Sequence, residues 1–120
     1  MSTRTVSDAV EKYLRLPQFT VSIRRDQTRN QYAYLLRRLC SLPYKDGTVG
    51  DIPTTKLKAS TCQELYYLMI EQSQGAGVRA ANYTVQVAVR AWNVLIKHDL
   101  LDKNPWSLVE RMQAAPRHTV

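Results

Sequence analysis

The feature that most constrains the fold is a long helical periodicity between Val78 and His98. Its apolar residues recur every three or four positions, so they fall on one arc of a helix that turns by about 100° per residue. The members of this arc are Ala81, Val85, Ala88, Val89, Trp92, Leu95 and Ile96. A stripe of this length has to be buried against other elements. We therefore predict one long core helix, followed by a short turn that Asn104-Pro105 closes.

Shorter periodic segments predict more helices on the N-terminal side. Thr5 or Ser7 can cap a first helix that runs to Leu16, where Pro17 stops it. A second helix starts within 22–27 and runs to about residue 40, because its apolar side chains also share one arc. We expect these two helices to pack on the long one and form a single core, which suits a chain of 120 residues.

The remaining segments predict a loop, a third helix and a short last helix. Residues 44–53 contain two turn signals, Asp46-Gly47 and Gly50-Asp51, and we interpret them as a connecting loop. Ser60 or Thr61 can cap the third helix, which ends at the glycines of 75–77. A short helix over 106–112 follows the long one. We find no pair of predicted strands, so the fold class is all-α.

The charge of the chain favours a polyanionic partner. Seventeen Lys and Arg residues against ten Asp and Glu give a formal net charge of +7 and an isoelectric point near 9.7. The first forty residues hold eight of those bases and three of the acids. The chain has no apolar run near the ~20 residues that a membrane span needs, and it does not start with a signal peptide. We therefore expect a soluble, cytoplasmic protein.

The polar side of the long helix carries residue types that suit DNA. It contains no carboxylate, and Arg, Asn and Gln can address base edges in a major groove. The residues on this side are Arg79, Asn82, Tyr83, Gln86, Arg90, Asn93 and Lys97. A solvated face that lacks acids by chance explains the same stripe, so the stripe alone decides nothing.

A second basic cluster surrounds the start of the helix that begins within 22–27. Unpaired backbone N–H groups at a helix start already favour a phosphate. The cluster consists of Arg24, Arg25, Gln27, Thr28, Arg29, Asn30 and Gln31. We assign its arginines to phosphates, and we expect Tyr32, one turn beyond Thr28, to lie largely in the core.

No constellation of residues predicts an enzyme, a metal site or a cofactor site. Cys40 and Cys62 lie far apart without a CxxC motif, and we interpret both as reduced thiols of the core. His98 stands at the end of the long helix, where a cation suits the helix dipole. The four glycines form no phosphate-binding loop.

Two stretches together resemble the N-terminal core-binding domain of phage-integrase-type tyrosine recombinases. The first is Thr28-x-x-x-Tyr32-x-x-x-Leu36, which is similar to the second helix of that domain. The second combines Arg79-Ala80-Ala81-Asn82, Val89-Arg90-Ala91-Trp92 and the closing Leu100-Leu101-Asp102-Lys103-Asn104-Pro105, similar to its last long helix. Asp99 departs from the family, where a glycine commonly follows this helix.

The resemblance implies a fold, a function and partners. It implies a SAM-like orthogonal bundle of four helices with a short extra C-terminal helix, over 1–116, and then at 117–120 the start of a linker to a catalytic domain. It further implies that the domain binds duplex DNA at the crossover core site as one jaw of a clamp, without catalytic residues of its own. Implied surroundings are the bacterial cytoplasm or nucleoid, with other recombinase protomers as partners of the full-length protein and a monomeric isolated domain.

The residues implied at the DNA are those of the two polar faces. On the second helix they are Arg24, Arg25, Gln27, Thr28, Arg29 and Gln31, and on the long helix Arg79, Asn82, Tyr83, Gln86 and Arg90. Asn82 and Gln86 are the candidates for contacts with base edges. This hypothesis requires Gln31 and Asn82 to lie exposed on the same side of the molecule.

Two other functions fit the same sequence. The chain could be a helical protein-interaction domain in which Trp92, Trp106 or the apolar edge of the long helix meets another protein and the positive charge is incidental. It could also be a free-standing repressor-like DNA binder. That third function needs a short turn between the second and third helices, and the loop over 44–53 argues against it.

Overall fold

The computed structural model describes residues 4–72 and 77–113, and it is mostly helical, as the sequence predicts. The α-helices in this part of the chain are α1 (Val6–Tyr13), α2 (Pro17–Thr20), α3 (Asp26–Ser41), α4 (Ala59–Gln72) and α5 (Gly77–Lys97). The short elements are β1 (Pro43–Tyr44), β2 (Gly47–Thr48) and three 3₁₀ turns, η1 (Val49–Asp51), η2 (Thr54–Lys56) and η3 (Pro105–Leu108). The linker expected at 117–120 lies outside the described residues.

The first helix begins as predicted and ends earlier. Thr5 is its N-cap, and the Thr5 hydroxyl accepts from the Asp8 amide at 3.1 Å while the Asp8 carboxylate accepts from the Thr5 amide at 3.2 Å. The helix ends at Tyr13, three residues before Leu16. Pro17 does more than stop a helix, since it is the first residue of α2, a position where its missing N–H costs nothing.

The connection between α3 and α4 is more ordered than the predicted loop. β1 and β2 form a small antiparallel hairpin, which corrects the expectation of no strand pair. Lys45 turns the chain at a φ of 54°, and Gly47 leaves room for the Asp51 carboxylate, which would lie 2.8 Å from a Cβ at that position. The interpretation of 44–53 as a connection without regular structure was therefore wrong at its first half, where the turn signals close a hairpin.

The C-terminal elements also differ in extent from the prediction. α4 begins at Ala59, just before the expected caps at Ser60 and Thr61. The predicted last helix over 106–112 is only the 3₁₀ turn η3, after which the chain has no helix or strand up to residue 113. Of the residues 75–77 that were expected to end α4, residues 75 and 76 lie outside the described part of the chain, and Gly77 is the first residue of α5.

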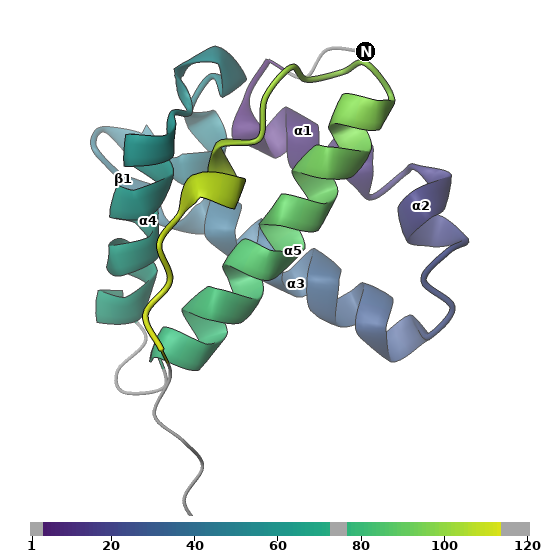
Figure 1. Cartoon of the computed structure of the whole chain (residues 1–120), viewed down its shortest axis with the longest axis horizontal. Helices are drawn as coiled ribbons and strands as arrows, with labels where there is room; N and C mark the ends of the chain where they lie inside the picture. The colour runs from purple at the N-terminus through teal and green to yellow at the C-terminus, as the bar shows by residue number, and fades with distance from the viewer. Residues whose placement is uncertain (1–3, 73–76, 114–120) are drawn as a thin grey trace, which may run out of the picture.

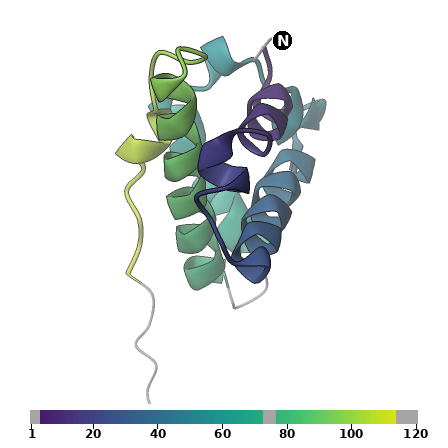
Figure 2. The ribbon, with the colours of Figure 1, turned by 90° about the vertical axis from the view of Figure 1, so that its right-hand side faces the viewer.

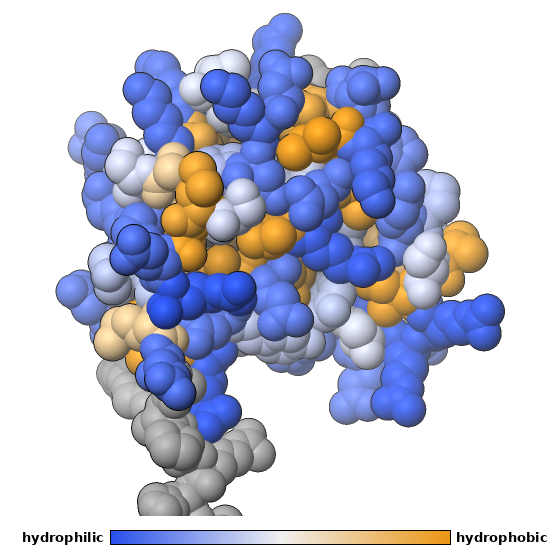
Figure 3. Space-filling view, viewed as in Figure 1, coloured by the Kyte–Doolittle hydropathy of each residue, from blue (hydrophilic) through white to orange (hydrophobic). Residues whose placement is uncertain are grey.

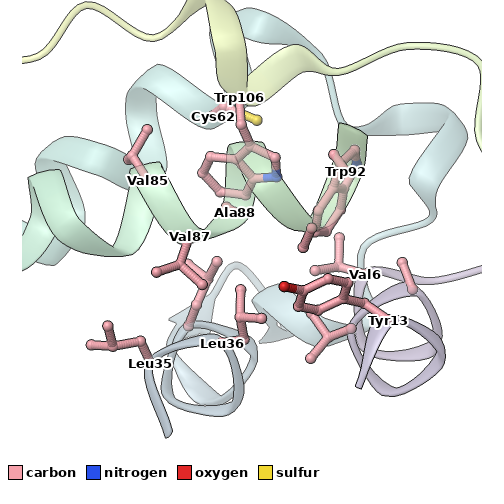
Figure 4. Close-up of a cluster of buried hydrophobic side chains, with 14 of the residues drawn as sticks. Val6, Tyr13, Leu35, Leu36, Cys62, Val85, Val87, Ala88, Trp92 and Trp106 are labelled. Atoms are coloured by element: carbon pink, nitrogen blue, oxygen red, sulfur yellow. The ribbon is translucent and has the colours of Figure 1, made fainter. Parts of the chain in front are cut away.

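α5 is the central helix of the core. Figure 4 shows Trp106 and Cys62 on one side of it and Leu35 and Leu36 on the other. Trp92 and Trp106 are both 1% exposed, and their rings meet edge to face with centroids 6.0 Å apart. The Nε1 atom of Trp106 has no hydrogen-bond partner among the described residues, but in Figure 4 it lies on the side of its ring that faces Trp92. The edge-to-face arrangement of the two rings is one that aromatic pairs in a protein core prefer.

Asp99 supplies the left-handed turn that ends α5. Its φ is 60°, and the Leu100 amide donates to the Leu95 carbonyl at 3.0 Å while the Asp99 amide donates to Ile96 at 2.9 Å. This is the hydrogen-bond pattern that a glycine usually supports at a helix C-terminus. The departure noted at Asp99 therefore leaves the geometry intact, because an aspartate tolerates this conformation better than most residues.

α3 and α5 pack across each other, with α3 behind α5 in Figure 1. Figures 1 and 2 show that α2 lies beside them, between the end of α1 and the start of α3. In Figure 3 the lower edge of the molecule is notched, and hydrophilic residues lie on both sides of the notch. None of the helices in the described part of the chain is long and apolar enough to cross a membrane.

Candidate nucleic-acid interface

The N-terminal turn of α3 presents basic and polar side chains to solvent. Arg25 is the N-cap residue of α3 and makes no side-chain capping hydrogen bond. Arg24, Arg25, Gln27 and Gln31 are exposed, and Thr28 is half-buried. Because the first backbone N–H groups of a helix have no partner within the helix, this turn offers both main-chain donors and guanidinium groups to an anion.

Arg29 has a different role from the one predicted for it. Its guanidinium pairs with the Asp26 carboxylate and donates to the carbonyl oxygens of Ile23 and Arg24. These contacts fasten the segment before α3 to the first turn of the helix. Because Nη1 and Nη2 of Arg29 are engaged inside the molecule, we leave Arg29 out of the interface.

α5 presents a ridge of polar residues on the side away from the core. Arg79 and Gln86 are exposed on this ridge, and Tyr83 between them is half-buried. The helix contains no acidic residue from Gly77 to Lys97. The ridge is thus a surface without carboxylates, as the sequence predicted.

Two tyrosines join the exposed faces of α3 and α5. The rings of Tyr32 and Tyr83 meet edge to face, with centroids 6.1 Å apart. Tyr32 is half-buried against the core rather than fully inside it. Burial raises the pKa of Tyr83, and the nearby Tyr32 raises it further, so the phenol stays neutral. We call the surface around this pair the α3–α5 face, made of Arg24, Arg25, Gln27, Thr28, Gln31, Arg79, Tyr83 and Gln86.

Asn82 does not belong to this face. Its side-chain oxygen accepts from the Tyr66 hydroxyl at 2.6 Å, and its amide nitrogen donates to the Met112 carbonyl at 2.9 Å. Asn82 therefore faces α4 and the C-terminal segment, whereas Tyr83 faces α3. The requirement stated for the DNA-binding hypothesis, that Gln31 and Asn82 lie exposed together, therefore fails at Asn82. Of the two candidates for base contacts only Gln86 remains, and a DNA surface on α5 has to use Tyr83 and Gln86 in place of Asn82.

Arg90 is likewise tied to the rest of the fold. Its Nε donates to the Tyr13 hydroxyl at 3.2 Å, and its Nη2 donates to the Gln18 carbonyl at 3.3 Å. Arg90 thus joins α5 to the end of α1 and to α2, and we leave it out of the interface. His98 lies near the same place, with its Nε2 2.9 Å from Oε1 of Gln18.

The sequence does not reveal the roles of Asn82 and Arg90, because their partners lie far away along the chain. The partners of Asn82 and Arg90 lie between 16 and 77 residues away in the chain. A helical wheel assigns a polar residue to the outside, but it cannot show that another segment covers that position. The same holds for Gln63 and Tyr66, which no sequence pattern marks and which contact Glu110 and Met112.

The cysteines lie in the interior as free thiols. Cys62 is fully buried and Cys40 half-buried. Burial raises the pKa of Cys40 to about 12 and also raises that of Cys62, so both are protonated at neutral pH. Among the residues that the structure describes, no three His, Cys, Asp or Glu side chains gather as metal ligands would.

Comparisons of the chain with models of protein families, with curated proteins and with solved structures find no match.

Proposed function

We propose that this chain is a duplex-DNA-binding module that uses the α3–α5 face. The observation that carries the proposal is the meeting of two acid-poor helix surfaces at Tyr32 and Tyr83. One of these surfaces is a helix start with two exposed arginines, and the other is a ridge without carboxylates. A single duplex can contact both, because the ring contact between Tyr32 and Tyr83 joins the two surfaces.

The residues of the face divide into two roles. Arg24 and Arg25 contact phosphates, which provide most of the affinity without distinguishing sequences. Gln86 and Gln31 contact base edges, where a forked amide can pair with adenine. A good bidentate contact discriminates between bases by about 1–3 kcal/mol, so we expect weak binding and modest specificity from a single domain.

The finer assignment is to the core-binding domain of a tyrosine recombinase that acts in site-specific recombination and integration. It rests on the resemblance of the Thr28, Tyr32, Leu36 series and of the closing Asn104-Pro105. Under this assignment the helices form a SAM-like orthogonal bundle of four, with α2 as an addition. The catalytic residues belong to a separate domain, and the partners of the whole protein include further recombinase protomers.

A salt titration tests the electrostatic part of the proposal. The affinity of the chain for a duplex of about 20 base pairs is measured by fluorescence anisotropy from low to high salt. The logarithm of the affinity is expected to fall linearly with the logarithm of the salt concentration, by roughly 0.9 for each phosphate contacted. A slope near zero would exclude this mode of binding.

A pair of variants tests the division of roles. Gln86→Ala is expected to change the order of preference among duplex sequences, while Arg25→Ala weakens binding to all of them about equally. Binding of each variant is measured on a panel of duplexes that differ by single base pairs. An equal loss on every duplex for both variants would refute base contact by Gln86.

A protein-interaction domain is the second candidate, and one observation favours it. Leu108 is 70% exposed and Met112 is 47% exposed, both in the C-terminal part of the described chain. Trp92 and Trp106, which this hypothesis also invoked, lie in the core and are not available to a partner. NMR shifts on adding DNA distinguish the candidates, since this one expects none at Gln31 or Gln86.

A further inference from the structure

The chain after η3 is held to the helical body by contacts to its backbone. We call residues 109–113 the exit segment. Gln63 contacts both main-chain groups of Glu110, since its Oε1 accepts from the Glu110 amide at 2.7 Å and its Nε2 donates to the Glu110 carbonyl at 3.1 Å. A side-chain amide here takes the place of a neighbouring strand.

Met112 is held in the same way by two other side chains. Its amide donates to the Tyr66 hydroxyl at 2.8 Å, and its carbonyl accepts from Nδ2 of Asn82 at 2.9 Å. The Tyr66 hydroxyl in turn donates to Oδ1 of Asn82 at 2.6 Å, which fixes the orientation of that amide. Tyr66 is fully buried and so provides a rigid anchor.

The spacing of these contacts is that of an extended strand. Residues 110 and 112 point their main-chain groups to the same side because alternate residues of a strand share an edge. Each of the two offers its N–H and its C=O, and all four groups have a partner. Gln63 and Tyr66 come from α4 and Asn82 from α5, so the site spans both helices.

We propose that Gln63, Tyr66 and Asn82 form a binding site for the backbone of an extended peptide, which this chain fills with its own exit segment. The ligand class is a strand with N–H groups at two alternate positions. At the two positions that the site binds, the side chains contribute little, since Glu110 and Met112 are exposed; Val109, which precedes them, is buried in the core. This inference does not depend on DNA binding.

The site also sets the direction in which the chain continues. Figure 1 shows the exit segment passing in front of α4 and α5 toward the N-terminal end of α5. Asn82 lies near that end, one turn after Arg79, which belongs to the α3–α5 face. The backbone contacts therefore bring the end of the exit segment close to the surface that we propose for DNA.

Hydrogen exchange with a matched pair of proline variants tests backbone recognition. In the whole chain the Glu110 and Met112 amides are expected to exchange at least about tenfold more slowly than an unstructured chain. Met112→Pro removes an N–H that the site binds, and it is expected to abolish the protection of Glu110. Arg111→Pro is the control, since the described contacts use no main-chain group of residue 111, and Glu110 keeps its protection.

Alanine variants test whether side chains of the strand matter. Met112→Ala and Glu110→Ala are expected to keep the protection within about twofold, while Asn82→Ala loses at least tenfold at Met112. Loss of protection in the two strand variants, or its persistence in Asn82→Ala, would overturn the proposal. If Asn82→Ala does not fold, as judged by circular dichroism, the proline pair decides.

A separate peptide tests whether the site binds a strand that is not part of the same chain. The probe is the acetylated and amidated peptide of residues 107–113, added at millimolar concentration to the Met112→Pro variant. It is expected to shift the side-chain amide signals of Gln63 and Asn82, and the same peptide methylated on the nitrogen of residue 112 is expected to leave them unchanged. Equal shifts with both peptides, or none with either, would show that no backbone-binding site exists apart from the intact chain.

Discussion

Asn82 and Tyr83 are neighbours in the sequence, but they belong to two different regions of the molecule. Tyr83 lies on the side of α5 that faces α3, where its ring meets Tyr32 and the surrounding residues stay open to solvent. Asn82 lies on the side that faces α4, where Tyr66 and Met112 use both ends of its amide. One helix thus carries an open polar surface on one flank and a closed polar network on the other.

This difference shows what makes a polar stripe available for binding. On the α3 side Arg24, Arg25 and Gln86 are exposed, so their side-chain donors remain for a partner. On the α4 side the exit segment covers the helix and takes the same kinds of donors for itself. The residue types are alike on the two flanks, and the path of the chain after η3 decides their roles.

Among the variants, Trp106→Ala is expected to lower the free energy of unfolding the most, because it removes a core side chain on the α4 side of α5. Trp106 is 1% exposed and packs on Trp92, so its loss leaves a large cavity and costs about 3–5 kcal/mol of the free energy of unfolding. Urea unfolding followed by circular dichroism measures this cost. Tyr34→Ala, at a residue 57% exposed on α3, is the control, with an expected change within about 0.5 kcal/mol. Similar losses in both would refute the different burial of the two sites.

The double variant Arg24→Ala/Arg25→Ala tests the open side. Loss of two phosphate contacts is expected to lower the salt slope of DNA binding by roughly 1.8 and the affinity near 0.1 M salt by about fiftyfold, on the order of 2 kcal/mol. Fluorescence anisotropy on one duplex measures both quantities. The free energy of unfolding is expected to stay nearly unchanged, since both side chains are exposed.

A control variant separates local contacts from net charge. Lys56→Ala/Lys58→Ala removes the same charge at exposed residues in and after η2. In Figures 1 and 2 this part of the chain lies far from the start of α3. We expect it to lower the slope by much less than the arginine variant. An equal fall would mean that the net charge, and not the α3–α5 face, determines binding.

Asn82→Ala and Gln86→Ala sharpen the comparison on α5 itself. Asn82→Ala leaves the Tyr66 hydroxyl and the Met112 carbonyl without their partner, so it is expected to cost about 1–2 kcal/mol of stability. Its salt slope for DNA is expected to stay that of the unchanged chain. Gln86→Ala is expected to leave the stability nearly unchanged, since Gln86 is exposed, and to change the preference among duplex sequences at an unchanged salt slope, since the side chain is neutral. Urea unfolding measures the stability of both variants, and anisotropy on a panel of duplexes measures their DNA binding. A loss of DNA binding in Asn82→Ala would contradict the prediction.

The sequence predicts the helices well because their signals are local. The apolar arc of α5 and the capping pair Thr5 and Asp8 depend on residues within a few positions of each other. The hairpin after α3 escaped the prediction because its two-residue strands are too short for an alternating pattern. The loss of the last helix has a different cause, since Gln63 and Tyr66 hold that segment extended from almost fifty residues away.

The candidate site could be predicted only in part, for the same reason. The exposed position of Gln86 follows from helical periodicity, which places it opposite the apolar arc of α5. Arg24 and Arg25 precede α3 and follow instead from the predicted helix start within 22–27. Arg29 could have been suspected, since Asp26 stands three residues before it and can pair with it. The role of Asn82 could not, because its partners come from α4 and from beyond η3. Local pattern identifies a polar surface, and only tertiary contacts show which of its donors are used.

The smallest predicted effect is a dependence of stability on pH that involves only the α3 side. Glu11 of α1 accepts from Nε and Nη2 of Arg37 of α3, both at 3.0 Å, and these hydrogen bonds lower the pKa of Glu11 against a smaller opposing effect of burial. A lowered pKa means that the pair contributes stability above the ordinary value of 4.5 and loses it as the pH falls through the folded value. Because both side chains are largely exposed, at 60% and 42%, the contribution is only about 0.2–1 kcal/mol.

Glu11→Gln measures this contribution, and Asn82→Ala provides the contrast from the α4 side. Glu11→Gln is expected to lower the free energy of unfolding at pH 6 by the amount of the ion pair and to have little effect at pH 2.5, where the glutamate is protonated. The Asn82 and Gln63 amides do not ionise, so the cost of Asn82→Ala is expected to be the same at both pH values. Urea unfolding of the three chains at pH 6 and pH 2.5 provides the measurement. If the cost of Glu11→Gln were also independent of pH, the attachment of α1 to α3 would not depend on this charge, and the two flanks of α5 would be held by the same kind of neutral contact.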